Sequence, residues 1–180
     1  MTQTEVFEKV LQSLQTAEIS YMITGSIASI QYGKPRVTYD LDIVAHFSMD
    51  KAKKFIQLLG QEFYADLIDI QEFIANKHHF NIIHSLSGLK IDFWPIKDEY
   101  DRLRLLRRRE EKIGKISAYF SSPEDIILKK LEWVKQGASS RHLDDIKGIL
   151  SIQGDKIDRD YIITWAERIT VKELLKEIGI

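Results

Sequence analysis

Two aspartates, one residue apart, are the first side chains in this 180-residue sequence whose spacing suggests chemistry. Asp40 and Asp42 stand at the beginning of the apolar segment Leu41–Phe47, which is predicted to be a buried strand. Because side chains alternate along a strand, both carboxylates should point to one face. Unpaired buried carboxylates are costly, and a divalent cation would offset a pair of them. The alternative is a strand end that is exposed to water.

A third aspartate lies in another predicted strand. Asp92 sits within Leu89–Trp94 and has apolar neighbours on both sides. If this strand lies beside the one that begins near Asp40 and Asp42, three acidic groups converge, and oxygen ligands of this kind suit Mg²⁺ in phosphoryl transfer. Alternatively, Asp92 faces solvent opposite Lys90.

A glycine and a serine form a turn after the predicted strand Ile19–Ile23. Gly25 and Ser26 open a short predicted helix that runs towards Tyr32, and Ser26 is expected to be its N-cap. The free backbone N–H groups and the positive end of this helix could face phosphate oxygens. Gly-Ser pairs also occur in ordinary loops, so this turn has meaning only together with the aspartates.

Alternating helices and strands are expected to position these residues. The C-terminal part is predicted to be helical and to start at Pro123, because proline favours the first helical position. The fold class is therefore α/β (α+β), with a small mixed sheet flanked by helices; residues 1–119 form the core, and residues 120–180 form a helical C-terminal subdomain. The other expected elements are a helix from Val6 to near Thr16, a helix between Ser48 and Gly60, an antiparallel hairpin of Phe80–His84 and Leu89–Trp94, a strand Lys115–Tyr119, and tail helices around Ile126–Val134, Leu143–Leu150, Ile157–Ile169 and Val171–Ile178.

Composition excludes several classes of protein. The apolar share of 44% and the net charge of −1 are those of a globular chain and not of a disordered one. The absence of cysteine excludes disulfides, thiolate zinc sites and a cysteine nucleophile. No segment approaches the roughly 20 apolar residues of a membrane span, so the sequence predicts a cytoplasmic protein with no membrane partner.

One segment concentrates basic side chains. It could dock a polyanion such as RNA, but Leu103, Leu105 and Leu106 interleave with the arginines, and Glu110 and Glu111 follow them. This pattern favours a solvated helix with local ion pairs. The basic residues are Arg102, Arg104, Arg107, Arg108, Arg109, Lys112 and Lys115.

Histidines and aromatic residues offer weaker candidates. A zinc site built on His78, His79 and His84 is disfavoured, because His79 and His84 should point to opposite faces of a strand. The aromatic side chains that could stack on a base, or could instead fill the core, are Tyr32, Tyr39 and Trp94.

The combination of Gly25-Ser26, Arg36-x-Thr38-x-Asp40-x-Asp42 and a later strand aspartate resembles the nucleotidyltransferase superfamily with the DNA-polymerase-β-like fold. The stretch Ile23–Asp42 is most similar to the branch that contains AbiEii-type toxins and small bacterial nucleotidyltransferases. This resemblance implies transfer of a nucleoside monophosphate from a nucleoside triphosphate to a hydroxyl on an RNA end, a protein or a small molecule, and a possible toxin–antitoxin component. It implies that Asp40, Asp42 and Asp92 are catalytic and bind Mg²⁺, with two ions expected and Mn²⁺ as an alternative. The implied nucleotide-binding residues are Gly25, Ser26, Arg36, Thr38 and Lys130.

The resemblance extends into the helical tail. Pro123-Glu124-Asp125 is followed by Lys130 at the place of the family's lysine, and Lys129 is the rival assignment. In the next helix, His142 replaces the first aspartate of the family pattern, and Asp145 matches the second. Lys130 and Asp145 could instead be surface charges. The resemblance implies a nucleoside triphosphate and an acceptor, which could be RNA, as binding partners. A cognate antitoxin or a second copy of the chain is a further candidate partner. The alternative function is a non-catalytic module that keeps the fold and binds a nucleotide or a protein.

Overall fold

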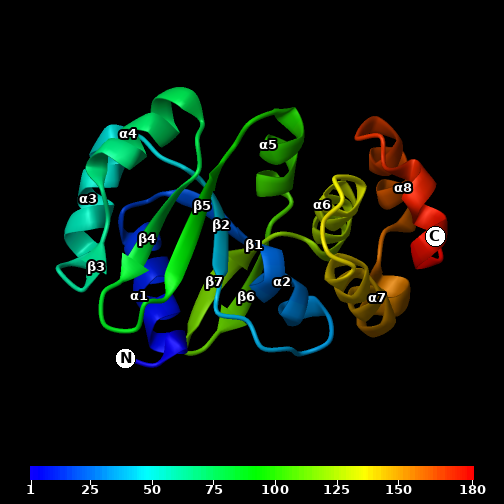
Figure 1. The fold of residues 1–180 in the computed structure, drawn as a ribbon, viewed down its shortest axis with the longest axis horizontal. Helices are drawn as coiled ribbons and strands as arrows, with labels where there is room; N and C mark the ends of the chain where they lie inside the picture. Colours follow the sequence, from blue (N-terminus) through cyan, green and yellow to red (C-terminus); the bar gives the residue numbers. More distant parts are fainter.

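The computed structural model describes all residues from 1 to 180, and its centre is a seven-stranded mixed sheet (Figure 1). Three strands form the middle of the sheet, β1 (Ser20–Thr24), β2 (Leu41–His46) and β5 (Lys90–Pro95). β2 pairs antiparallel with β1 and parallel with β5. The strands that carry Asp42 and Asp92 are therefore neighbours, which was the condition for their carboxylates to lie together.

Four further strands extend the sheet, whose order is β3-β4-β5-β2-β1-β7-β6. β4 (Phe80–His84) pairs antiparallel with β5, which confirms the predicted hairpin. β3 (Phe63–Tyr64) covers the outer edge of β4. On the other side, β7 (Ile116–Phe120) runs parallel to β1, and β6 (Arg109–Ile113) pairs antiparallel with β7.

The prediction of a helix through the whole basic segment is wrong. Helix α5 (Glu99–Leu106) ends early, and the chain then forms strand β6. Gly114, with φ of +57°, turns the chain between β6 and β7, and a positive φ is easily adopted only by glycine. The charge spacing suits a helix, but backbone pairing with β7 over five residues of each strand decides the structure.

Three helices pack together along one side of the sheet, α1 (Gln3–Thr16), α3 (Met49–Leu59) and α4 (Leu67–Asn76). The expected end of α1 at Thr16 and the expected bounds of α3 between Ser48 and Gly60 are confirmed. Beneath them, Phe47 makes edge-to-face contacts with four other phenylalanines of the core, at centroid separations of 5.6–5.7 Å. This packing supports β2 and β5 on the face of the sheet that these helices cover.

Helix α2 (Gly25–Tyr32) follows β1 without a loop. Its N-cap residue is Thr24, so the prediction that Ser26 caps this helix is wrong. Gly25 adopts φ of +63°, and this left-handed conformation turns the strand directly into the helix. Ser26 therefore lies inside the first turn, where its hydroxyl accepts a hydrogen bond from Arg36.

The chain after β7 is helical. Ser122 caps α6 (Pro123–Lys135), with proline in the first turn as predicted, and α7 (Arg141–Gln153) and α8 (Arg159–Arg168) follow. The segments Gly154–Lys156 (η1) and Lys172–Ile178 (η2) are 3₁₀ helices. Figure 1 shows these elements at the end of the molecule opposite α3 and α4. A single hydrophobic cluster contains both sheet and tail residues, and the division at residue 119 stays a prediction.

A buried polar network joins α6 to its surroundings. Asp125 is fully buried and accepts hydrogen bonds from the hydroxyls of Ser122, Tyr100 and Tyr161, at 2.8, 3.3 and 2.7 Å. Glu124 accepts a hydrogen bond from Arg109. The Glu-Asp pair is thus part of the scaffold that orients α6. None of the helices is both long enough and apolar enough to cross a membrane.

Candidate active site

Asp42 and Asp92 lie side by side on the neighbouring parallel strands β2 and β5. They are direct partners in the strand register, so their side chains leave the same face of the sheet. On the other side of β2, Asp42 is paired in register with Thr24, the last residue of β1. Two carboxylates therefore stand beside the turn at Gly25, where β1 becomes α2.

Asp40 lies just before β2 and is exposed. The expected convergence of three carboxylates is not seen, because no three Asp, Glu or His side chains are arranged to hold one ion. Lys90 Nζ lies 2.8 Å from Asp92 Oδ1, and the indole N–H of Trp94 donates to Asp42 Oδ1 at 3.1 Å. The Lys90 side chain is 46% exposed and so has room to move aside. The oxygen donors of Asp42 and Asp92 fit a hard divalent ion such as Mg²⁺ or Mn²⁺.

The charge on Asp42 is disfavoured by its surroundings. Burial raises the pKa of the Asp42 carboxyl, and the nearby charges of Asp92 and Asp40 raise it further. The hydrogen bond from Trp94 and the charge of Lys130 act in the opposite direction and lower it. The net shift is upward, so the ionised carboxylate lacks sufficient compensation from the protein alone.

Both the left-handed backbone conformation and the lack of space for a side chain require glycine at position 25. A Cβ atom at this position would lie 2.1 Å from Asp42 Oδ2, which is far inside van der Waals contact. The absent side chain thus leaves room for the Asp42 carboxylate. The sequence interpretation assigned the glycine to close approach of phosphates; the structure adds that the nearest neighbour is the proposed metal ligand.

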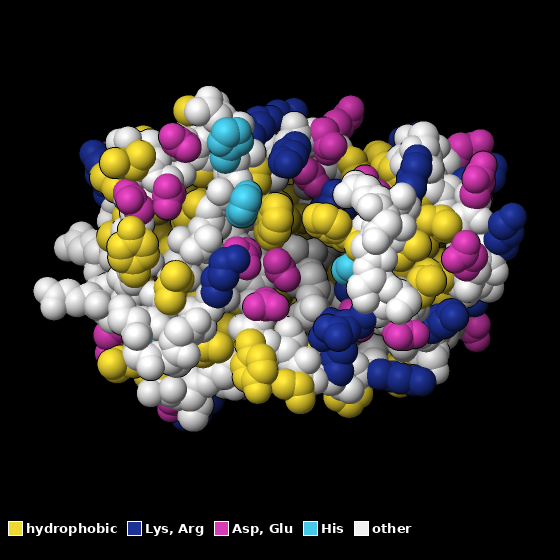
Figure 2. Space-filling model, in the orientation of Figure 1, with side chains coloured by type: hydrophobic (Ala, Val, Ile, Leu, Met, Phe, Trp, Pro, Cys, Tyr) yellow, Lys and Arg dark blue, Asp and Glu magenta, His cyan; other side chains and the backbone are white.

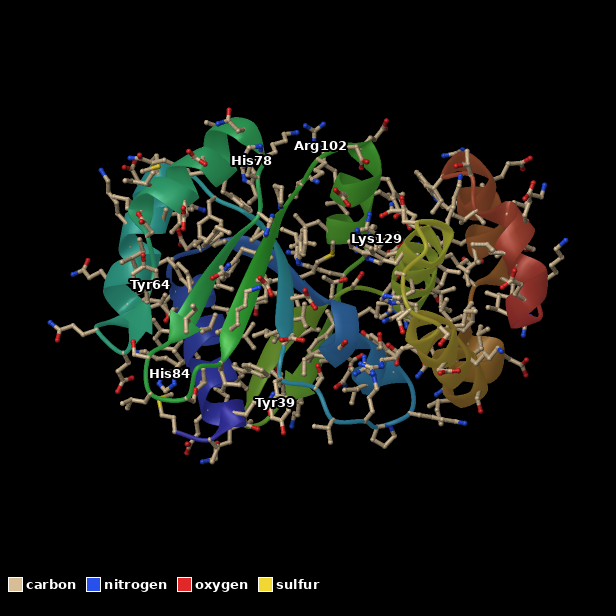
Figure 3. The ribbon with its side chains drawn as sticks, in the orientation of Figure 1. Tyr39, Tyr64, His78, His84, Arg102 and Lys129 are labelled. Atoms are coloured by element: carbon tan, nitrogen blue, oxygen red, sulfur yellow. The ribbon has the colours of Figure 1, made fainter.

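A cleft of about 470 Å³ opens between this part of the sheet and helix α6. Figure 2 shows a hollow at the centre of the molecule with acidic side chains gathered beside it. Lys129 lies on α6 on the side that faces the sheet (Figure 3). Among the residues that line the cleft are Thr24, Gly25, Ser26, Asp42, Trp94, Lys129, Lys130, Trp133 and His142.

Lys130, one of the two candidate lysines, is buried and bonded. Its ammonium donates to Asp145 Oδ2 at 2.7 Å, and Asp145 also accepts two hydrogen bonds from Arg36. Burial lowers the pKa of Lys130, and Asp145 opposes this shift. Lys129 instead pairs with Glu132 at 2.8 Å. The alternative reading of Lys130 and Asp145 as surface charges is wrong, because their side chains are 5% and 8% exposed.

Two of the remaining sequence candidates lie in different places. Thr38 lines a second cavity next to α1, and not the cleft. Its carbonyl accepts a hydrogen bond from Gln3. His142 lines the cleft, and its ring lies nearly parallel to that of Trp133, at 14°. Burial lowers the pKa of His142, and the charge of Lys130 lowers it further.

The three aromatic candidates differ in environment. Tyr32 is buried in the core, whereas Tyr39 is exposed in the loop before β2 (Figure 3). Only Trp94 lines the cleft, where its ring packs against His79 at 5.0 Å. Figure 3 shows His78 and His84 near opposite ends of β4, so these two histidines share no site.

Ion pairs engage three arginines of the basic segment. Arg104 is buried and pairs with Asp101 at 2.9 Å, and Arg107 and Arg109 both approach Glu124. The guanidinium of Arg108 lies over the ring of Tyr119. Arg102, Lys112 and Lys115 are exposed and form no ion pair, so the segment still presents some positive charge to solvent.

No family model and no curated protein matches the sequence. Solved structures do match. The solution structure of the antibiotic-resistance factor ANT(2'')-Ia is similar with a TM-score of 0.62 at 15% identity, over 98% of this chain and 97% of that one. A nucleotidyltransferase-like protein from Paracoccidioides brasiliensis matches with a TM-score of 0.56 at 16% identity, over 98% and 91% of the two chains. The crystal structure of ANT(2'')-Ia with adenylyl-2''-tobramycin has a TM-score of 0.57 at 14% identity, over 93% and 99%.

The chain has the polymerase-β-like nucleotidyltransferase fold. At this level of identity, the similarity concerns the fold; the resemblance to the AbiEii branch stays a prediction. Within this fold, Asp92 is the register partner of Asp42, and Asp42, Gly25 and Lys130 line the cleft; their roles stay a prediction.

Two contacts in this region were missed by the sequence interpretation. Trp94 was considered only for base stacking or core packing, whereas its indole nitrogen bonds to Asp42. Its position two residues after Asp92 on the same strand was the available signal, since residues i and i+2 share a face. The bridge that Asp145 makes between Arg36 and Lys130 had no local signal, because Arg36 is 109 residues away along the chain.

Proposed function

We propose that this protein is a metal-dependent nucleotidyltransferase that moves a nucleoside monophosphate from a nucleoside triphosphate to a hydroxyl group. The observation that carries this proposal is the register pair of Asp42 and Asp92 beside the Gly25 turn. A pair of acidic side chains on one face of a nucleotidyltransferase-like sheet, next to a helix N-terminus, combines an oxygen-rich cation site with a phosphate site.

Each residue has a separate task in this proposal. Asp42 and Asp92 would hold one or two Mg²⁺ ions, which would neutralise charge on the phosphates. Backbone N–H groups at Gly25 and Ser26 bind phosphate oxygens at the start of α2. Lys130 adds a positive charge within the same cleft.

The reaction is a displacement at the α-phosphorus. The acceptor oxygen forms a bond to phosphorus, the bond to the bridging α–β oxygen breaks, and pyrophosphate leaves with the electron pair. Asp92 takes the proton of the acceptor hydroxyl. Asp92 suits this task because it stands beside Asp42, and its Oδ1 is paired with the partly exposed side chain of Lys90.

The cleft favours a compact acceptor over a polymer end. Its volume of about 470 Å³ falls in the range of small-molecule sites. Three arginines of the nearest basic segment, Arg104, Arg107 and Arg109, are engaged in ion pairs within the protein. One of the similar structures contains an adenylylated small molecule. Transfer to RNA, as in a toxin, is the competing outcome that the experiment distinguishes.

The test pairs binding with transfer. Wild type and Asp92→Asn are incubated with each labelled triphosphate, Mg²⁺ and either pooled metabolites or pooled RNA, and triphosphate affinity is measured in parallel. The variant should keep most of its affinity and lose about 10²-fold or more in transfer rate, the scale of a general base. Asp155→Asn makes the same chemical change at an exposed position and serves as the control.

Equal transfer by wild type and Asp92→Asn would remove Asp92 from the mechanism. If wild type transfers label to nothing but still binds a triphosphate, the protein is a binding module that keeps the fold. Label on RNA alone would replace the compact acceptor with a polymer.

A further inference from the structure

Asp145 joins two cations that come from distant parts of the chain. Its Oδ1 accepts from Arg36 Nε at 2.9 Å, and its Oδ2 accepts from Arg36 Nη2 at 3.1 Å and from Lys130 Nζ at 2.7 Å. Arg36 Nη2 donates in addition to the hydroxyl of Ser26 at 2.6 Å. The carboxylate on α7 thus connects α6, the segment before β2 and the first turn of α2.

This group of four side chains has a surplus of positive charge. Two cations and one carboxylate sum to +1, and the group adjoins the N-terminus of α2, which adds a partial positive charge. Lys130 is close enough to Asp42 for each to affect the other's ionisation. Negative and positive side chains are therefore separated in this region: Asp42 and Asp92 lie on the sheet, and Arg36 and Lys130 lie next to the helices.

The carboxylate of Asp145 favours the charged form of Lys130 and holds its ammonium group in place. The Lys130 side chain is 5% exposed, and burial by itself favours the neutral amine. The bond to Asp145 opposes that tendency, and it also fixes the direction of the ammonium group. Arg36, whose side chain is 26% exposed, is oriented by two hydrogen bonds to the same carboxylate.

We propose that Asp145 is a positioning residue, which holds Lys130 and Arg36 as a two-cation clamp for the polyphosphate tail of the substrate. This inference rests on the proposed function and assigns the β- and γ-phosphates to the clamp, next to Ser26. Asp145 itself makes no contact with the substrate; it acts through the two cations. Helix α7 is thereby a part of the nucleotide site and not only a covering element.

The experiment compares Asp145→Asn with Asp144→Asn, its exposed neighbour on the same helix. Inorganic tripolyphosphate and a nucleoside triphosphate are titrated into each protein by calorimetry. Asp145→Asn should bind both about 10- to 100-fold more weakly, the scale for losing charge-assisted hydrogen bonds, while Asp144→Asn should match wild type. In steady-state transfer, KM for the triphosphate should rise more than kcat falls.

A double variant separates positioning from general stability. In a Lys130→Met background, adding Asp145→Asn should weaken tripolyphosphate binding less than it does in wild type, because one of the two cations that Asp145 positions is already absent and only Arg36 remains to be released. Should Asp145→Asn fail to fold, Arg36→Gln removes one cation from a partly exposed position and should weaken tripolyphosphate binding by a similar factor. Unchanged or tighter binding by the foldable variant would overturn the clamp.

The outcomes also separate this inference from the proposed function. Transfer by wild type together with an unaltered triphosphate KM in Asp145→Asn would reject the clamp and keep the enzyme. Tripolyphosphate binding that depends on Asp145, without transfer to any acceptor, would keep the clamp and reject the enzyme. No binding of tripolyphosphate or triphosphate by wild type would reject both.

Discussion

Trp94 donates its indole N–H to Asp42 Oδ1 at 3.1 Å, from the strand next to the one that carries Asp42. This bond fixes one carboxylate oxygen, and Asp42 Oδ2 faces Gly25. A side chain that orients a metal-binding carboxylate in this way contributes to cation affinity without touching the ion.

Substitution of Trp94 by phenylalanine keeps an aromatic ring and removes the donor. Trp94→Phe should lower the affinity for Mn²⁺ by about 10-fold or more, the effect typical of outer partners of metal ligands. Calorimetric titration with Mn²⁺ measures it. Trp133→Phe is the matched control, since Trp133 lines the same cleft without bonding to Asp42. Equal Mn²⁺ affinities for the two variants would show that the Trp94 bond has no such role.

Neutralising Asp42 should stabilise the protein when no divalent ion is present. Burial, followed by the charges of Asp92 and Asp40, raises the pKa of Asp42, so its ionised form costs folding free energy at neutral pH. Asp42→Asn should therefore raise Tm by about 1–4 °C in EDTA at pH 7, the shift expected for a gain of roughly 0.5–1 kcal/mol.

The pH dependence provides the check on the Asp42 prediction. An acid whose pKa is raised in the folded state loses its cost as pH falls and the carboxyl becomes protonated. The Tm difference between wild type and Asp42→Asn should therefore shrink towards pH 4. In Mn²⁺, wild type should gain Tm and the variant should gain little. A variant less stable than wild type in EDTA at pH 7 would contradict the electrostatic argument.

A methyl group at residue 25 should disturb the metal ligand as well as the phosphate turn. The added Cβ would meet Asp42 Oδ2 at 2.1 Å, so Gly25→Ala must displace the carboxylate. We expect Mn²⁺ and triphosphate affinities to fall together by about 10-fold or more, because displaced ligands and a strained left-handed backbone act together. Gly25→Val should abolish triphosphate binding.

Gly88→Ala is the control for backbone strain in that experiment. Gly88 has φ of +69°, but no atom lies within 4 Å of a Cβ built there. Gly88→Ala should lose stability and keep the wild-type affinities for Mn²⁺ and triphosphate. If Gly25→Ala binds Mn²⁺ and triphosphate like Gly88→Ala, the close contact with Asp42 is not essential.

Asp145 should contribute stability that disappears in acid. Burial raises the pKa of its carboxyl, but the hydrogen bonds from Arg36 and Lys130 outweigh burial and hold the pKa below its usual range. A carboxyl with a depressed pKa stabilises the fold above its unfolded pKa of about 3.9, and this contribution is lost as pH falls through the folded value. Urea unfolding should show a larger difference between wild type and Asp145→Asn at pH 7 than at pH 3. A difference that is independent of pH would contradict this origin.

The sequence by itself determined the local features of the site. Short apolar segments placed Asp42 and Asp92 in strands, and Gly25 and Pro123 marked where strands pass into helices, because apolar runs and the conformational limits of glycine and proline act over a few residues. The hairpin of β4 and β5 was also predictable from its short connecting turn. With these features, the resemblance of the motifs to nucleotidyltransferases indicated the fold.

Tertiary structure decided the contacts between distant segments. The charge pattern of Arg109–Ile113 suits a helix, but pairing with β7 makes it a strand, since backbone hydrogen bonding across a sheet outweighs weak local preference. Likewise, nothing near Asp145 in the sequence indicates Arg36, and nothing near Asp42 specifies that β5 lies beside β2. These relationships depend on how helices and strands pack into one core, which no local pattern encodes. They place Asp92 beside Asp42, and they place the pair of Arg36 and Asp145 beside Lys130, which lines the cleft together with Asp42.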